Sequence, residues 1–314
     1  MTMAGILVAD IGGTHARFGI ADADGHVEAI EVLKCGDYES LADAAQAYLA
    51  GRDVAPKGAS IAVASPITGD VVTLTNRAWS FSQSNLRDAL GTEWVAVVND
   101  FEAISLGIPL LKDGDRVAIG GGTATEGAPI AVIGPGTGLG TSMLIPLGGR
   151  WHAIAAEGGH VTMAAFDETE YEVLSRLRRQ IGHISAERML SGPGLVHLYR
   201  TLSEIDGDAP ESLAPYDVTR LAISGENETC RRALDMFSAM LGTVASNLAL
   251  SLGARGGVYI AGGIVPDLPN EIFGPTFRAR FEDKGRFSDY MAAIPSYVIT
   301  HPYPAFLGLT QVHP

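Results

Sequence analysis

Two segments of this chain share one layout, in which a glycine turn containing a threonine separates two apolar runs. They read "ILVADIGGTHARFGI" over residues 6–20 and "IAVIGPGTGLGTSMLI" over residues 130–145. Each predicts two strands joined as a hairpin, and a further apolar run at 27–33 extends the first into an antiparallel meander. Because a chain of 314 residues exceeds the size at which single hydrophobic cores usually stop growing, the repeat favours two related lobes facing one cleft.

The first turn is suited to hold a phosphate group. It follows neither G-x-x-x-x-G-K-[ST] nor G-x-G-x-x-G, but Gly12 and Gly13 leave room for a ligand beside successive backbone N–H groups. Asp10 would repel a phosphate unless a cation lay between them, so its natural role is to orient Mg²⁺ or its waters. These features together indicate a site for a metal–nucleotide. The alternative is an Asp that ends a strand and caps a hairpin turn.

The second turn, "GPGTGLGT", has the same potential. Gly136 and Gly138 would allow close backbone contact with a phosphate, and Thr137 would supply a hydroxyl donor. A flexible glycine loop is the alternative. A third glycine turn, with Gly262 and Gly263, closes the apolar run in "GGVYIAGGIVP".

Strands that alternate with helices along the chain predict an α/β fold. Apolar runs at 59–65 and 94–100 read as strands, and a helix is expected near 39–50. Ligands of open α/β sheets bind beyond the carboxyl ends of strands, which is where Asn99 and Asp100 stand. Asp100 is either a general base that takes the proton of a substrate hydroxyl or the N-cap of the following helix.

Two segments in the second half carry further candidates. "EGGHV" places Glu157 and His160 around two glycines, where both side chains can face one small polyol. Zinc is not favoured, because no HExxH motif or cysteine cluster accompanies them. Ser185 is an expected helix N-cap, and Glu187 in the first turn can simply favour the helix dipole. The residues alone leave both ligand-binding and structural roles open.

Composition excludes several classes of function. A net charge of −14 argues against a nucleic-acid binder, because such binding rests on clustered Lys and Arg. Only Cys35 and Cys230 are present, and no leader with a basic and an apolar region is recognised, so we expect a cytoplasmic protein. The uncharged run at 236–252 is short for a membrane span and places apolar side chains on one face, which predicts a buried core helix.

Taken together, the motifs resemble those of the ATP-dependent bacterial glucokinases of the hexokinase–actin–Hsp70 superfamily. The resemblance covers the chain nearly end to end. It points to the proteobacterial branch, because the cysteine cluster that follows E-x-G-H in the repressor-related sugar kinases is absent. The segments that carry it are "ADIGGTHARF", "ASPITGDVVTLTNRAWSFS", "VVNDFEAISLGIPLL", "GPGTGLGTSMLI", "EGGHVTMAAFDETEYEVL", "IGHISAERMLSGPGLVHLYR", "GGVYIAGGIVP" and "FEDKGRFSDYMAAIPSYVI".

The resemblance implies a role for each candidate residue. Asp100 would accept the proton of the glucose 6-hydroxyl, and Asn99 would hydrogen-bond the sugar. Glu157, His160 and Glu187 would be the remaining glucose ligands. The first phosphate loop would hold Asp10, Gly12, Gly13 and Thr14, the second would hold Gly136, Thr137 and Gly138, and Gly262 and Gly263 would lie in the adenosine-side motif.

The resemblance also implies a fold, substrates and an assembly. Two ribonuclease-H-like lobes of the actin-like ATPase kind would close on D-glucose and Mg-ATP, in a homodimer without nucleic-acid or membrane partners. Residues 1–110 with 300–314 would form the small lobe and 111–299 the large lobe, the polar stretch 111–129 being the crossover. The alternatives are a broader hexokinase, mannokinase or fructokinase, and, in another class, a non-catalytic sugar sensor.

Two positions depart from the commonest pattern of that family. His15 stands where many relatives carry Asn, and Ser65 stands where some carry Cys. An imidazole can still donate a hydrogen bond towards nucleotide phosphates, although its charge varies near neutral pH. The departure at position 15 therefore bears on nucleotide affinity and not on the reaction.

Overall fold

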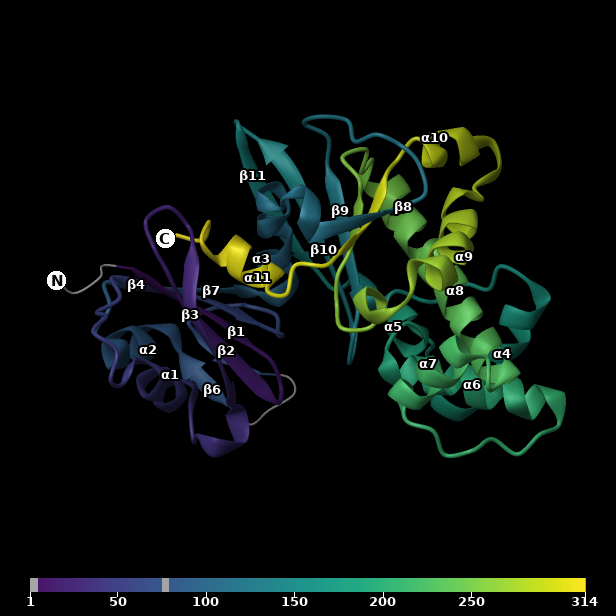
Figure 1. Cartoon of the computed structure of the whole chain (residues 1–314), viewed down its shortest axis with the longest axis horizontal. Helices are drawn as coiled ribbons and strands as arrows, with labels where there is room; N and C mark the ends of the chain where they lie inside the picture. The colour runs from purple at the N-terminus through teal and green to yellow at the C-terminus, as the bar shows by residue number, and fades with distance from the viewer. Residues whose placement is uncertain (1–4, 75–78, 314) are drawn as a thin grey trace. The chain divides into compact units, whose positions relative to one another are not determined.

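The chain divides into two compact units in a computed structural model that describes residues 5–74 and 79–313 (Figure 1). The first unit comprises Met1–Asp113, Trp151–Ala155 and His301–Pro314, and the second comprises Gly114–Arg150 and Ala156–Thr300. The predicted boundaries did not assign 151–155 to the first lobe. Residues 75–78, within the family-like segment "ASPITGDVVTLTNRAWSFS", lie outside the described residues.

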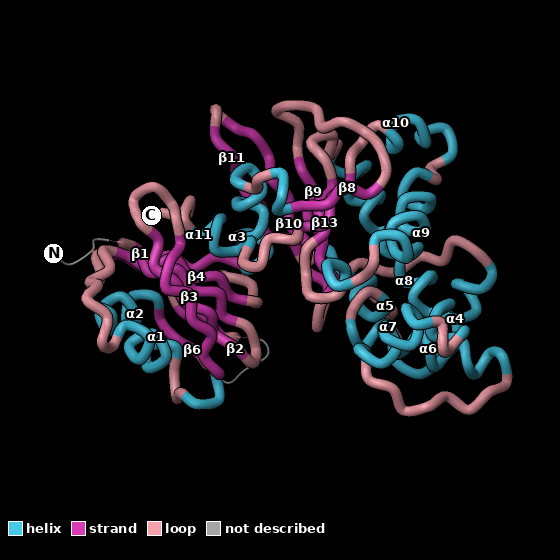
Figure 2. The backbone as a smooth tube through the Cα atoms, in the orientation of Figure 1, coloured by secondary structure: helices cyan, strands magenta, loops and turns pink. Residues whose placement is uncertain are grey.

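The first unit is built on a sheet with the strand order β3-β2-β1-β4-β7 (Figure 2). β1, β2 and β3 form the predicted antiparallel meander, and β1, β4 and β7 run parallel. Every residue of β4 is buried, as expected of a central parallel strand covered on both faces. The elements are β1 Ile6–Ile11, β2 His15–Ala21, β3 Val27–Lys34, α1 Leu41–Leu49, β4 Gly58–Val63, β5 Val71–Thr73, β6 Ser80–Ser82, α2 Gln83–Leu90, β7 Trp94–Asn99, α3 Asp100–Gly107 and α11 Pro304–Leu309.

The C-terminal segment packs on the sheet of the first unit, with α11 lying beside α3 (Figure 1). Phe306 and Leu309 of α11 are buried in one cluster with Val8 of β1 and Ala103 of α3. The buried hydroxyl of Ser60 in β4 donates to the carbonyl of Val312 at 2.9 Å. Residues from the two ends of the chain therefore share one core.

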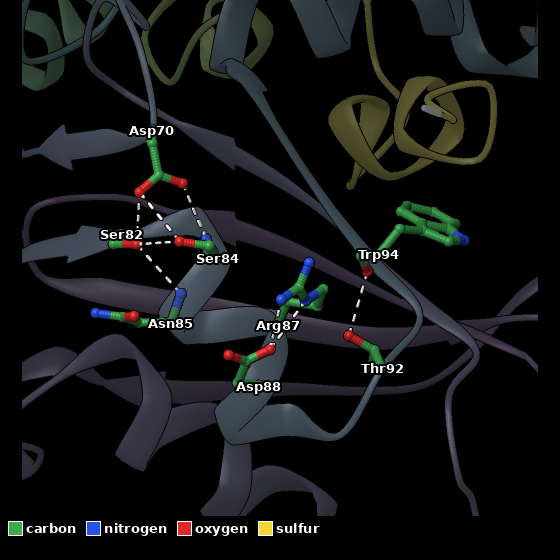
Figure 3. A network of polar contacts seen from close by, with 8 residues as sticks. All are labelled: Asp70, Ser82, Ser84, Asn85, Arg87, Asp88, Thr92 and Trp94. Carbon is green, nitrogen blue, oxygen red and sulfur yellow. Dashed lines mark hydrogen bonds and ion pairs between the residues drawn. The ribbon is translucent and has the colours of Figure 1, made fainter.

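A polar network ties the β5–β6 hairpin to α2 (Figure 3). Asp70 accepts hydrogen bonds from the hydroxyl of Ser82 at 2.6 Å and from the N–H of Ser84 at 3.0 Å. These bonds, led by that of Ser82, hold the pKa of Asp70 below its ordinary value. The Ser82 hydroxyl also accepts from the N–H of Asn85, and through this bond Ser82 is the N-cap of α2. The network fixes where this surface helix begins.

In the sheet of the second unit, β10, β9, β12, β13 and β8 follow one another in this order. β12 runs parallel to both β9 and β13, whereas β10 and β8 are antiparallel to their neighbours. The elements are β8 Arg116–Ile119, β9 Ile130–Pro135, β10 Leu139–Leu147, α4 Glu168–Ile181, α5 Ala186–Met189, α6 Gly192–Asp206, α7 Pro215–Ser224, α8 Glu228–Leu252, β12 Val258–Ile260, α9 Asn270–Glu282, α10 Ser288–Ala292 and β13 Ser296–Ile299. β11 Arg150–Ala156 contains residues 151–155, which belong to the first unit.

The uncharged run at 236–252 belongs to a buried core helix, as predicted. It forms most of α8, which begins after the N-cap Asn227 and ends at Gly253, a glycine with φ of 60°. Leu234, Phe237 and Leu241 are fully buried in the main core of the second unit. Among the described residues, α8 is long and apolar enough to cross a membrane, but 67% of its apolar window is buried inside the structure.

The segment 111–129, predicted as the crossover between the lobes, contains a short strand that local patterning did not indicate. Residues 116–119 form β8, which pairs with β13 through Ile119 and Ser296. The strand is short and its partner lies far along the chain, so local patterning gives little signal for it.

The pH dependence of stability tests the burial of the Cys230 thiol in α8. Burial, with a smaller contribution from Glu211, raises the pKa of the Cys230 thiol from 9.0 to about 11. Between these two values the unfolded chain releases the thiol proton while the folded chain retains it, so stability falls as pH rises. We expect the urea midpoint to fall less between pH 8.5 and 10.5 in Cys230→Ala than in the wild type. Equal losses in both proteins would show that this thiol does not contribute.

Candidate active site

The first glycine turn connects β1 to β2 at residues 12–14. The N–H of Gly12 donates to the carbonyl of His15 at 3.0 Å, and the N–H of Cys35 donates to the carbonyl of Thr14 at 2.9 Å. Gly12 does not adopt a positive φ, so what glycine contributes here is the missing side chain. Gly13 and Thr14 are exposed, and their N–H groups donate no hydrogen bond among the described residues. Two backbone donors therefore remain available to an anion.

Asp10 lies one residue before the end of β1, opposite Arg17 of β2. The two side chains are 3.5 Å apart and partly exposed. Burial raises the pKa of Asp10, and Arg17 opposes this only in part. Burial thus favours the neutral form of this carboxyl, whereas a cation bound beside it would favour the ionised form. The surroundings of Asp10 fit the role of orienting magnesium or its waters.

Asn99 and Asp100 lie at the same edge of the sheet as this turn. β1, β4 and β7 are parallel, and their register places Ile11, Val63 and Asn99 in one row. Across two strand spacings, the backbones of Ile11 and Asn99 are separated by about 10 Å. Asp100 and the first turn therefore both follow carboxyl ends of parallel strands, the usual place for ligand binding in α/β sheets.

The structure shows which residue caps α3. The N-cap of α3 is Asn99, whose side-chain oxygen accepts from the N–H of Phe101 at 2.9 Å. Asp100 is the first residue of the helix, and the reading of Asp100 as N-cap is therefore wrong by one position. The amide NH₂ of Asn99 can still donate to a ligand.

Glu102 was not singled out from the sequence. Its carboxylate accepts a hydrogen bond from the backbone N–H of Asn99, and burial, the larger effect, raises its pKa. The side chains of Asn99 and Glu102 thus each accept a backbone N–H at the start of α3 and help to fix it. The spacing N-x-x-E before an apolar run was the available signal. The carboxyl group of Glu102 lies two residues from Asp100 and has a raised pKa, but its hydrogen bond at the helix start gives it a structural role.

The second and third glycine turns meet in the second unit. The turn after β9 is closed by the N–H of Gly136, which donates to the carbonyl of Gly138 at 2.8 Å, and Thr137 is exposed. β12 pairs with β9, and Gly262, with φ of 88°, approaches Pro135 so closely that an added Cβ would lie 2.3 Å from its carbonyl oxygen. Gly263 follows and is exposed. Of the three predicted nucleotide-binding segments, the second and third glycine turns are therefore neighbours.

Glu157, His160 and Glu187 form one cluster. His160 lies between the two carboxylates, with Nε2 3.7 Å from Glu157 and Nδ1 3.9 Å from Glu187. Glu187 belongs to α5, which is capped by the side chain of Ser185 as predicted. The side chains of His160 and Glu157 are 59% and 60% exposed, while that of Glu187 is 33% exposed. Such a cluster offers several acceptors and a donor to a polyol.

Thr141 holds the loop that carries two of these side chains. Its buried hydroxyl donates to the carbonyl of Ala156 at 3.1 Å and accepts from the N–H of Gly158 at 2.9 Å. Gly159 packs against Leu139, where a Cβ would meet the Leu139 carbonyl oxygen at 2.1 Å. The loop therefore rests directly on β10, the strand that leaves the second glycine turn. No sequence pattern singled out Thr141.

Comparison with solved structures identifies the fold. A crystal structure of glucokinase from an Antarctic psychrotroph matches 98% of this chain and 98% of its own length, with a TM-score of 0.88 and 36% identity. The predicted α/β fold of the actin-like ATPase kind is confirmed. The fold is that of the sugar kinases.

Sequence comparison narrows this class to one family. The family model described as Glucokinase matches residues 7–313. The chain is 52% identical over 307 residues to a glucokinase of Paramagnetospirillum magneticum, covering 97% of this chain and 96% of that one. It is 47% identical to a glucokinase of Tolumonas auensis, with 96% and 95% covered. The chain belongs to the glucokinase family.

Proposed function

We propose that this chain transfers the γ-phosphoryl group of ATP to the 6-hydroxyl of D-glucose, with Asp100 as general base. Membership of the glucokinase family makes it an ATP-dependent hexose kinase. The observation that carries the residue assignment is the placement of Asp100 at the start of α3, where its neighbour Asn99 takes the capping role. Asp100 is thus not required as the N-cap.

The proposed roles divide between the two units. In the first, Asp100 accepts the proton of the sugar hydroxyl, Asn99 hydrogen-bonds the sugar, and the Gly12–Thr14 turn binds phosphate. In the second, the carboxylate–histidine cluster of Glu157, His160 and Glu187 binds the remaining hydroxyls. The turn at 136–138 binds phosphate, and Gly262 and Gly263 lie on the adenosine side. The exposed N–H groups of Gly13 and Thr14 support the phosphate assignment.

Phosphoryl transfer needs positioning and charge neutralisation more than covalent help from the protein. The sugar ligands fix the hydroxyl in line with the γ-phosphorus. Asp100 takes the proton as the new P–O bond forms, while the bond from the γ-phosphorus to the β,γ-bridging oxygen breaks and ADP leaves. Asp10 would hold, through water, the magnesium that accompanies ATP, and that ion would supply positive charge to the phosphate oxygens. The place of Asp10 at the end of β1, just before the Gly12–Thr14 turn, supports this part of the proposal.

A coupled ATP assay across glucose, mannose, fructose and N-acetylglucosamine tests the proposal. We expect glucose to give the highest kcat/KM, because a site that pairs each hydroxyl with a buried or charged group rejects sugars that leave groups unpaired. Comparable rates with several hexoses would favour a broader hexokinase. No turnover with any hexose would favour a sugar sensor.

A homodimer in the cytoplasm completes the proposal. Cys35 and Cys230 are both buried thiols, in keeping with a reducing compartment. Light scattering on the purified chain would test the assembly.

His15 tests the first phosphate turn. It begins β2, is partly buried, and its carbonyl accepts from the N–H of Gly12. We expect His15→Asn to change KM for ATP by about two- to tenfold, the value of one hydrogen bond, with a smaller change in KM for glucose. His26→Asn, at an exposed position paired with Asp22, is the matched control and should alter neither constant. An effect confined to glucose would remove His15 from the phosphate site.

A further inference from the structure

We propose that Glu187 is also the positioning residue of the second glycine turn, so that one carboxylate serves both the sugar and the nucleotide. The inference rests on the proposed function, which assigns Glu187 to the sugar and the turn to phosphate. What is new is the contact between them within the second unit.

The contact is a hydrogen bond from the turn to the carboxylate. The N–H of Leu139, the residue after Gly138, donates to Oε2 of Glu187 at 3.0 Å. The absence of a side chain at Gly138 makes this approach possible, because a Cβ there would lie 2.5 Å from the same oxygen. Gly138 is therefore needed for the carboxylate as well as for any ligand.

The chain segment around Glu187 holds the turn at both ends. Glu187 binds the N–H of Leu139 at the exit, and the N–H of Gly192 donates to the carbonyl of Gly136 at the entrance, at 2.8 Å. The bond from Gly136 to Gly138 closes the turn itself. The N–H of Thr137 donates no hydrogen bond among the described residues, so it remains available to a phosphate. The turn is thus held in a fixed shape.

The second oxygen of the carboxylate is left for the sugar. Oε1 of Glu187 lies 3.9 Å from Nδ1 of His160, beyond hydrogen-bond length. Glu157 differs, because its only recorded side-chain partner among the described residues is His160, at 3.7 Å. The two carboxylates of the cluster therefore differ in their contacts. Glu157 contacts the imidazole of His160 and is available to the sugar, whereas Glu187 also accepts a hydrogen bond from the second glycine turn.

This difference predicts an effect on nucleotide binding in the absence of sugar. A residue that only binds glucose leaves the affinity of the free enzyme for nucleotide unchanged. Loss of the Glu187 carboxylate releases the Leu139 N–H and frees the turn, so part of the binding energy is spent on ordering it. A hydrogen bond to a charged group is worth enough to change affinity about tenfold.

The test is calorimetric titration of the full chain with magnesium and the non-hydrolysable imido analogue of ATP, without sugar. We expect Glu187→Ala and Glu187→Asp to weaken binding about tenfold, because neither side chain reaches Leu139. Glu187→Gln keeps an acceptor oxygen and should stay within about twofold of the wild type. Glu157→Ala is the matched control: it should weaken glucose binding and leave analogue binding unchanged. Thermal unfolding of each variant confirms that it is folded, and the Asp variant replaces Ala if Ala does not fold.

Three results would overturn the proposal. Glu187→Asp or Glu187→Ala could bind the analogue as tightly as the wild type, Glu157→Ala could weaken it equally, or Glu187→Gln could be as weak as Glu187→Ala. Failure of the proposed function would look different. A wild type that binds the analogue but phosphorylates no hexose would end the glucokinase assignment, while the comparison of the Glu187 variants would still stand.

Discussion

Replacing Asp100 with Asn is expected to lower kcat with glucose at least ~100-fold, the lower range for removal of a general base. An amide cannot take the proton of the 6-hydroxyl as the hydroxyl attacks phosphorus. The fold should be retained, because Asn can supply the oxygen that Asp100 now uses to accept from the N–H of Phe101, and the helix keeps Asn99 as its cap. Steady-state kinetics should show a KM for glucose that changes far less than kcat.

Glu102→Gln is the matched control for this prediction. It makes the same carboxyl-to-amide change two residues along α3, at a group whose raised pKa would otherwise make it a rival base. Since the Gln side-chain oxygen can still accept from the N–H of Asn99, we expect stability within about 0.5 kcal/mol and a kcat within a few-fold of the wild type. Near-normal turnover of Asp100→Asn would show that Asp100 is not the base. Equal losses in both variants would indicate that disturbance of the helix start, not proton transfer, is the cause.

Local patterns in the sequence were sufficient for much of the fold. The hairpins around Gly12 and Gly136 could be predicted because an apolar run, a turn and a second apolar run lie within a few residues of one another. The buried face of α8 follows from helical periodicity alone. Asn99 and Asp100 were chosen as candidates for their chemistry and their place at a strand end. The structure confirms the strand end, whereas the alternative of Asp100 as N-cap is wrong by one residue.

Long-range contacts could not be predicted in the same way. The bond between Leu139 and Glu187 joins residues 48 apart in sequence, and β8 is recognisable only through its pairing with β13. Thr141 has no local signal because its function is to bond two backbone groups across a loop. These contacts depend on the register of strands and on the packing of loops, which residue types alone do not determine.

Replacing Gly308 with Ala is expected to disrupt the packing of α11 on α3. A Cβ at position 308 would lie 1.7 Å from the carbonyl oxygen of Ala103 and 2.8 Å from the nitrogen of Gly107. Both groups are helix backbone and cannot rotate away as a flexible side chain could. The two helices must separate, which opens the buried cluster that contains Ala103, Phe306 and Leu309.

We expect Gly308→Ala to lower the free energy of unfolding by about 1–3 kcal/mol, the range for overpacking a well-packed core. Because α3 begins at Asp100, displacement of the helix should also lower kcat, since small misplacements of a catalytic group are costly.

Gly36→Ala is the matched control: its Cβ would meet nothing within 4 Å, so we expect a change within about 0.5 kcal/mol. Thermal unfolding and kcat measured on both variants test the argument. An unchanged melting temperature in Gly308→Ala would mean that α11 does not press on α3 as closely as the structure shows, and a lower melting temperature with unchanged kcat would separate the stability of this contact from the placement of Asp100.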